Sequence, residues 1–94
     1  MTKILWSRLA VQDLDSIADH YADISPDFVV RIEDALLAAA DFLRDAPGAG
    51  SVFGSAGVRK WTLARLPYMI LYRSDTTGIA ILRIHHARQN WRMS

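Results

Sequence analysis

Residues 58–85 read VRKWTLARLPYMILYRSDTTGIAILRIH, and this stretch decides the fold. It contains three runs rich in aliphatic and aromatic residues, at 58–65, 68–74 and 79–85. Residues 66–67 and 75–78 separate the runs and have the proline, glycine and aspartate content of tight turns. Because these connections are too short for crossover helices, the three runs are predicted to form an antiparallel meander.

Two amphipathic helices are predicted upstream of these strands. From Leu9 to about Ile24, apolar residues recur every three or four positions, and Ser7 is a candidate N-cap. A second helix is predicted from Pro26, because Ser25 can cap it and proline is accepted at the first helical position. The connection is short, so the two helices should form an antiparallel hairpin.

The predicted fold is α+β, with the order β-α-α-β-β-β in one domain over residues 1–94. The apolar residues 3–6 are predicted to form the N-terminal strand, and the glycine-rich residues 46–57 a loop. The antiparallel helical hairpin then packs on a mainly antiparallel sheet. Both faces of the last two strands are apolar, so one face should cover the hairpin and the other should accept a partner.

Composition excludes several classes of protein. At 51% hydrophobic residues, the 94-residue chain can build a packed core, and without cysteine it has neither disulfides nor thiolate metal sites. The glycines at 48–54 lack the strand-turn-helix order of a dinucleotide site, so no cofactor is expected. Since neither a secretory signal nor an apolar run of about 20 residues is present, we expect no membrane contact and a cytoplasmic location.

Charge is distributed unevenly along the chain. Residues 1–50 hold four basic against nine acidic residues, a net charge of −5. Residues 51–94 hold seven basic residues against Asp75 alone, a net charge of +6. This asymmetry indicates a basic face for an anionic partner, although solvated acids on helices and solubilising arginines on strands would give the same pattern.

Several basic residues fall at regular strand positions. Arg59, Trp61 and Arg65 alternate onto one face, and Arg83 shares a face with His85. Guanidinium groups suit phosphate, and neighbouring aromatic rings can stack on unpaired bases. A cation–π pair or an arginine bound to a carboxylate remains an equally good interpretation.

The histidines and aspartates offer weaker signals. His85 and His86 point to opposite faces of a strand, so no metal site is expected there, and either ring can transfer protons or hold a structural hydrogen bond. His20 is expected to be solvated. Asp13, Asp15, Asp19 and Asp23 are expected to form a solvent-facing arc of the first helix.

Taken in order, these features resemble the RelE/ParE family of toxins. The resemblance covers nearly the whole chain and rests on five motifs: Ala10-x-x-Asp13-Leu14-x-x-Ile17-x-x-Tyr21, Leu43-x-x-x-Pro47-x-x-Gly50, Gly57-Val58-Arg59, residues 67–73 (PYMILYR) and residues 81–88 (ILRIHHAR). It implies a toxin held inactive in a hetero-oligomer by a cognate antitoxin, whose C-terminal segment wraps over the helices and sheet. The complex is expected to bind operator DNA through the antitoxin.

The family divides by target, and the resemblance favours one branch. RelE-like toxins cleave mRNA in the ribosome and commonly carry a catalytic arginine in the strand that here reads YMILY, at 68–72, where this chain has none. ParE-like toxins inhibit DNA gyrase, and the opening Pro67-Tyr68 and the ending 83–88 look more like them. Gyrase inhibition is therefore favoured, with mRNA cleavage or an inactive antitoxin-binding module as alternatives.

Each branch implies its own site residues. For gyrase inhibition, the expected contacts with the target are Arg59, Trp61, Arg83, His86, Arg88, Trp91 and Arg92. For mRNA cleavage, the residues expected to bind phosphate or move protons are Arg59, Arg65, Arg83 and His86. Both interpretations require the basic side chains to gather beside an open groove, and arginines scattered and individually paired with internal acids would contradict them.

Overall fold

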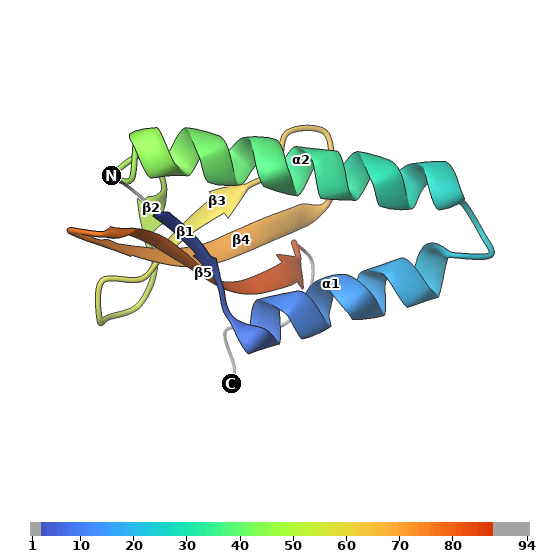
Figure 1. Ribbon diagram of the computed structural model, residues 1–94, viewed down its shortest axis with the longest axis horizontal. Helices are drawn as coiled ribbons and strands as arrows, with labels where there is room; N and C mark the ends of the chain where they lie inside the picture. Colours follow the sequence, from blue (N-terminus) through green and yellow to red (C-terminus); the bar gives the residue numbers. More distant parts are fainter. Residues whose placement is uncertain (1–2, 88–94) are drawn as a thin grey trace.

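The computed structural model describes residues 3–87 and shows two helices packed against one sheet (Figure 1). The elements are β1 (Lys3–Trp6), α1 (Arg8–Tyr21), α2 (Pro26–Asp45), β2 (Ser51–Val52), β3 (Arg59–Thr62), β4 (Tyr68–Asp75) and β5 (Gly78–His86). The strand order is β1-β5-β4-β3-β2, with β1 parallel to β5 and the other neighbours antiparallel. The predicted α+β fold, with its meander, is confirmed.

Three elements differ from the prediction by more than one residue at an end. Helix α1 stops at Tyr21, before Ile24, because its carbonyl accepts the N–H groups of Ile24 and Ser25 and closes a tight connection to α2. Strand β3 is shorter, because the Leu63 N–H donates to the Tyr68 carbonyl and residues 63–67 form the turn. The loop prediction is wrong at Ser51–Val52, which pairs with β3 as β2.

Both predicted N-caps are confirmed. The Ser7 hydroxyl accepts the Ala10 N–H at 3.0 Å and donates to the Leu82 carbonyl at 2.7 Å, so it caps α1 and also fastens its start to β5. The Ser25 hydroxyl accepts the Phe28 N–H at 3.3 Å, and Pro26 follows at the first position of α2. Each cap satisfies an N–H group that has no partner within its helix.

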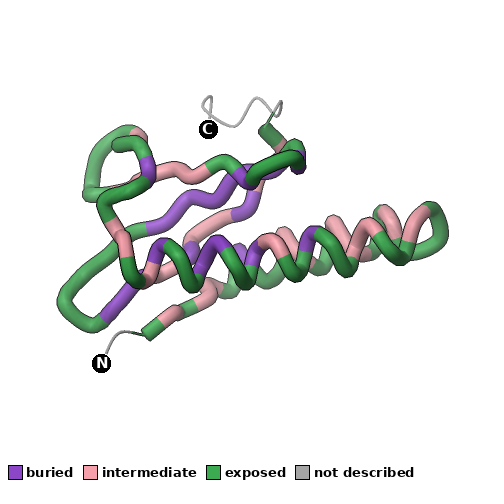
Figure 2. The backbone as a smooth tube through the Cα atoms, turned by 90° about the horizontal axis from the view of Figure 1, so that it is seen from above, coloured by how far each residue is buried: buried purple, intermediate pink, exposed green. Residues whose placement is uncertain are grey.

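The core lies between α2 and one face of the sheet. The buried stripe of α2 contains Ile32, Leu36, Ala39, Ala40 and Leu43. It packs with the buried residues of β4 and β5, among them Ile70, Tyr72 and Ile81, and Figure 2 shows these segments in purple. The sheet therefore buries its near face, which is the face toward α2.

The second face of β4 is covered, contrary to the prediction of an open apolar face. Met69 and Leu71 alternate with the core residues Ile70 and Tyr72, so their side chains lie on the far face. They are nonetheless only 3% and 9% exposed. The large exposed apolar side chains lie mainly on the helices instead, as at Val11 and Leu37.

A buried tyrosine ties the glycine-rich segment to the sheet. The Tyr72 hydroxyl donates to the Pro47 carbonyl at 2.7 Å and accepts the Gly50 N–H at 2.9 Å. Arg59 donates from Nη1 to the Gly50 carbonyl at 2.7 Å. A Cβ on Gly50 would lie 2.6 Å from the Lys60 carbonyl oxygen, so only glycine fits this approach.

Candidate functional site

Helix α1 lies along the edge of β5 that β1 leaves open. Strand β1 ends at Trp6, which pairs with Ile81. Ser7 then bonds the carbonyls of Ile81 and Leu82, and further along α1 the Asp13 carboxylate accepts the Ile84 N–H at 2.9 Å. The helix thus continues the edge of the sheet and satisfies backbone groups that a longer β1 would have paired.

Asp13 also binds the side chain of Arg83. The Arg83 Nε donates to one carboxylate oxygen at 2.8 Å and Nη2 donates to the other at 3.0 Å, which is the paired geometry that a guanidinium favours. These bonds raise the pKa of Arg83 above its ordinary value. The prediction that Asp13 faces solvent is wrong, because its side chain is only 18% exposed and lies against β5.

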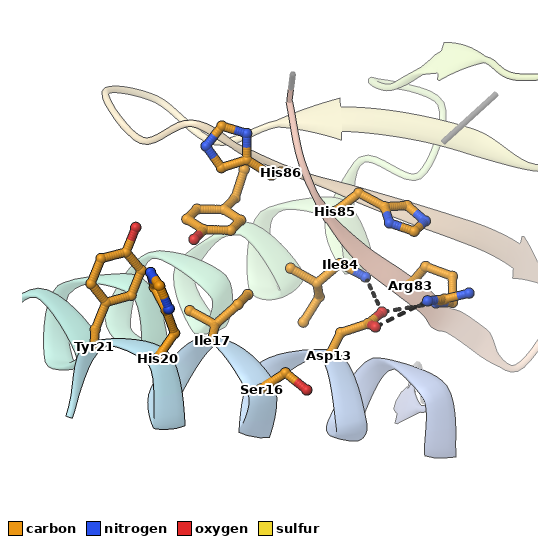
Figure 3. Close-up of a pocket in the computed structure, with 10 residues that line it drawn as sticks. Asp13, Ser16, Ile17, His20, Tyr21, Arg83, Ile84, His85 and His86 are labelled. Carbon is orange, nitrogen blue, oxygen red and sulfur yellow. Dashed lines mark hydrogen bonds and ion pairs between the residues drawn. The ribbon is translucent and has the colours of Figure 1, made fainter. Parts of the chain in front are cut away.

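A pocket of about 250 Å³ opens beside this ion pair, between α1 and the ends of β4 and β5 (Figure 3). We call it the α1–β5 pocket. Its lining residues are Asp13, Ser16, Ile17, His20 and Tyr21 of α1, Tyr68 of β4, and Arg83, Ile84, His85 and His86 of β5. The α1 residues recur at three- and four-residue spacing, so one side of the helix faces the pocket.

Aromatic rings line the pocket at the end away from Arg83 and on the side formed by the sheet. His20 meets the edge of Tyr21 at 4.7 Å between ring centroids, and Tyr68 meets the edge of His86 at 5.2 Å. Burial, and secondarily the hydroxyl of Tyr21, raise the pKa of Tyr68 to about 12. The Tyr68 hydroxyl therefore stays protonated to a higher pH than an ordinary tyrosine hydroxyl.

The structure brings together only some of the predicted site residues. Arg83 and His86 line the same pocket. Arg59 pairs with Tyr72 and therefore lies on the near face of the sheet, where it binds the Gly50 carbonyl. Trp61 shares that face and packs on Phe42 of α2 with 5.2 Å between ring centroids.

The remaining predicted residues lie elsewhere. Arg65 is exposed in the turn between β3 and β4, with a φ of 65°. Arg88, Trp91 and Arg92 lie outside the described residues. The four residues expected for RNA cleavage thus do not form one cluster, since Arg59 and Arg83 stand on opposite faces of the sheet.

The expected basic surface is present in part, on the far face of the sheet. Leu71 pairs with Lys60 on one side and with Arg83 on the other, so both cations lie on the far face. Arg73 lies on the same face, because it stands two residues after Leu71 in β4. Pairing with acids is also observed, for Arg83 with Asp13 and for Arg44 with Asp41 and Asp45.

A second, more apolar groove of about 350 Å³ separates the two helices. We call it the α1–α2 groove. Its apolar lining consists of Trp6, Ala10, Val11, Leu14, Leu36 and Leu37. Glu33 and Asp34 add acids to the lining, and Val11 and Leu37 remain 46% and 58% exposed. The groove is therefore a concave apolar surface with acids in its lining.

The pocket contains five residues that were not predicted as site residues: Asp13, Ser16, His20, Tyr21 and Tyr68. A signal for two of them was present, because Asp13 and Tyr21 each stand about one helical turn from Ile17, on either side of it along one stripe of the helix. The position of α1 along the edge of β5 was not available from that pattern. No group of three or more His, Asp or Glu side chains within residues 3–87 is arranged to hold a metal ion.

Comparison with known families gives one match over almost the whole chain. The model of the family described as "ParE toxin of type II toxin-antitoxin system, parDE" matches residues 4–91. Y4kP of Sinorhizobium fredii is 32% identical over 89 residues, which cover 95% of this chain and 92% of that protein. Toxin RelE2 of Caulobacter vibrioides is 32% identical over 87 residues, covering 93% and 97%.

Solved structures agree with these sequence matches. A chain of the chromosomal ParDE toxin–antitoxin system from P. aeruginosa superimposes with a TM-score of 0.78 at 33% identity, over 94% of this chain and 98% of that one. The isolated E. coli RelE toxin superimposes with a TM-score of 0.58 at 10% identity, over 99% and 92%. The second match concerns the fold alone.

Among the described residues, no helix is long and apolar enough to cross a membrane.

Proposed function

Because this chain belongs to the ParE family of toxins of type II toxin–antitoxin systems, we propose that it arrests growth by inhibiting DNA gyrase. The family implies a cognate antitoxin as partner. The ParE branch is supported by the family model and by the match to the ParDE system at 33% identity, whereas the match to the RelE toxin has 10%.

The observation that carries the proposal is the arrangement of the cationic residues. RNA cleavage needs several donors aimed at one phosphate, yet Arg59 binds the Gly50 carbonyl on the near face and Arg83 binds Asp13 at the opposite edge. Strand β4 supplies only apolar and aromatic side chains from Tyr68 to Tyr72. A surface that binds a protein target does not need several cationic side chains directed at one point.

We propose the far face of the sheet as the surface that meets the target. Lys60, Arg73 and Arg83 give it positive charge, which favours association with an acidic partner or with a protein bound to DNA. His86, Arg88, Trp91 and Arg92 remain proposed contacts at the end of the chain. Arg59 and Trp61 are weaker candidates, because Arg59 already binds the Gly50 carbonyl and Trp61 already packs on Phe42 of α2.

We assign the antitoxin to the helical side. The α1–α2 groove exposes Val11 and Leu37, whose burial by a partner would remove apolar surface from water. Glu33 and Asp34 in its lining favour a segment that carries lysine or arginine beside its apolar anchors. The resulting hetero-oligomer would contact operator DNA through the antitoxin.

Ribosome-dependent mRNA cleavage is the second candidate. Its support is the similarity to toxin RelE2 at 32% identity over 93% of this chain. An inactive antitoxin-binding module is the third. Expression of this chain alone, and then together with the small reading frame beside its gene, separates a toxin from an inactive module. Growth arrest that the neighbour relieves supports the proposal, and unimpaired growth with abundant folded protein would overturn it.

A further inference from the structure

The α1–β5 pocket has one carboxylate and one guanidinium in its lining. Asp13 is the one carboxylate in the lining, and it already accepts three hydrogen bonds, from Arg83 Nε, Arg83 Nη2 and the Ile84 N–H. Asp15 and Asp19 of α1, and Asp23 just after it, are exposed and do not line it. Asp13 is therefore the one acid of α1 that reaches this pocket.

Arg83 keeps donors that Asp13 does not take. A guanidinium carries five N–H groups, and Asp13 engages Nε and one of the two on Nη2. The other three N–H groups belong to a side chain that is 37% exposed. Because Asp13 fixes the plane of the guanidinium, little side-chain entropy is lost when a second anion binds to it.

The two ends of the pocket differ in chemistry. Arg83 and His85 stand at one end, beside Asp13, whereas His20 and Tyr21 stand at the other (Figure 3). Asp13 and His20 are seven residues apart on α1, which corresponds to about 10 Å along a helix. Ile17 and Ser16 lie between the two ends, and the edge-to-face pair of Tyr68 and His86 closes the side formed by the sheet.

We propose that the α1–β5 pocket binds a nucleoside monophosphate unit, with its phosphate at Arg83 and its base against the rings of His20 and Tyr21. An arginine fork at one end matches a phosphate, and aromatic rings about 10 Å away match the flat face of a base. The unit can be a free nucleotide or the terminal nucleotide of a nucleic acid. This site goes beyond the proposed function and does not depend on whether gyrase or the ribosome is the target.

The test is titration of the whole chain with a nucleoside monophosphate, followed through backbone amide shifts by NMR at constant ionic strength. The amides of Ile17, His20 and Ile84 should shift. Inorganic phosphate and the unphosphorylated nucleoside should each bind at least about tenfold more weakly, because each occupies one end only. A short oligonucleotide with a 5′ phosphate, run beside the free nucleotide, distinguishes the two sources.

Two variants in the lining test the two ends and keep both Asp13 and Arg83, since they replace exposed side chains of α1. Ser16→Asp places a negative charge near the proposed phosphate and should weaken binding of the nucleotide and of inorganic phosphate about tenfold. His20→Ala should weaken binding of the nucleotide and leave binding of inorganic phosphate unchanged. Arg65→Ala removes an exposed arginine outside the pocket and should change neither affinity.

Several outcomes would overturn the proposal. One is that the amide shifts are confined to residues outside the pocket. Another is that His20→Ala and Arg65→Ala lose the same amount of affinity for the nucleotide. A third is that an acidic dipeptide binds the pocket while nucleotides do not. A chain that binds the nucleotide but fails to inhibit gyrase would leave this site intact and remove only the proposed target.

Discussion

The carboxylate of Asp13 binds the guanidinium of Arg83, 70 residues further along the chain, through two hydrogen bonds of 2.8 and 3.0 Å. The same carboxylate accepts the Ile84 N–H, so one side chain joins α1 to two consecutive residues of β5. This contact places α1 along the edge of the sheet, creates the α1–β5 pocket and sets the position of a cation on the far face.

Replacing Asp13 should destabilise the fold. Asp13→Ala leaves the Arg83 guanidinium and the Ile84 N–H without their acceptor, at a cost of about 2 kcal/mol, since both groups are partly shielded from water. Urea unfolding followed by tryptophan fluorescence measures this change. Asp15→Ala, on the exposed side of the same helix, should change the free energy of unfolding by no more than about 0.5 kcal/mol. Equal effects of the two substitutions would contradict the role given to Asp13.

The glycine at position 50 should resist substitution, whereas the glycine at 48 should not. A Cβ at Gly50 meets the Lys60 carbonyl and the Tyr72 ring at 2.6–2.7 Å, so Gly50→Ala should cost about 1–3 kcal/mol and break the hydrogen bonds of Tyr72. Nothing lies within 4 Å of a Cβ at Gly48, which makes Gly48→Ala the matched control. Thermal unfolding compares the stability of the two variants. If both or neither lose stability, the close approach at Gly50 does not explain the effect of the substitution.

Tyr68 should ionise about two pH units above an ordinary tyrosine. Its pKa is raised from 10.0 to about 12, first by burial and then by the hydroxyl of Tyr21. The folded state therefore holds a proton that the unfolded chain releases, so this contribution to stability is complete below pH 10 and is lost as the pH rises toward 12. Absorbance at 295 nm follows the titration.

Two substitutions separate the causes of this shift. Tyr21→Phe should lower the pKa of Tyr68 part of the way toward 10, because burial remains, and Tyr72→Phe should leave it in place. Tyr68 titrating near pH 10 in the folded protein would show that its hydroxyl is not enclosed as described.

Most of the fold followed from patterns within single elements. Ser7 and Ser25 as caps, Pro26 at a first helical position and the turns near Pro67 and Gly78 are local signals, and each was found where predicted. Strand β2 was missed because two residues show no alternation, and its pairing depends on contacts between Tyr72 and residues 47–50.

The site was less predictable because it depends on how elements meet. Arg83 and His86 were identified from charge and strand position, and they do share a pocket. Asp13 was assigned to solvent because an isolated helix offers no second partner, whereas α1 lies against β5 in the structure. Arg59 was expected at the target surface because its strand pattern gives no sign of a partner elsewhere in the chain. In the structure that partner is the Gly50 carbonyl, which belongs to a loop.

Substitution in the α1–α2 groove should weaken antitoxin binding without affecting folding. Leu37→Lys places a charge on an exposed apolar side chain of the groove, and should weaken the complex at least about tenfold. Val52→Lys alters another exposed apolar residue, in β2, and serves as the control. Calorimetric titration with the purified antitoxin measures both affinities, and a weaker complex for Val52→Lys alone would move the antitoxin away from the groove.

Inhibition of gyrase can be measured with purified components. The chain is added to DNA gyrase with supercoiled plasmid and, in parallel, to a translation reaction programmed with mRNA, each with and without antitoxin. Gyrase inhibition predicts gyrase-dependent DNA breaks that the antitoxin prevents, together with intact mRNA. Cleaved mRNA at the ribosome, with gyrase activity unchanged, would contradict it.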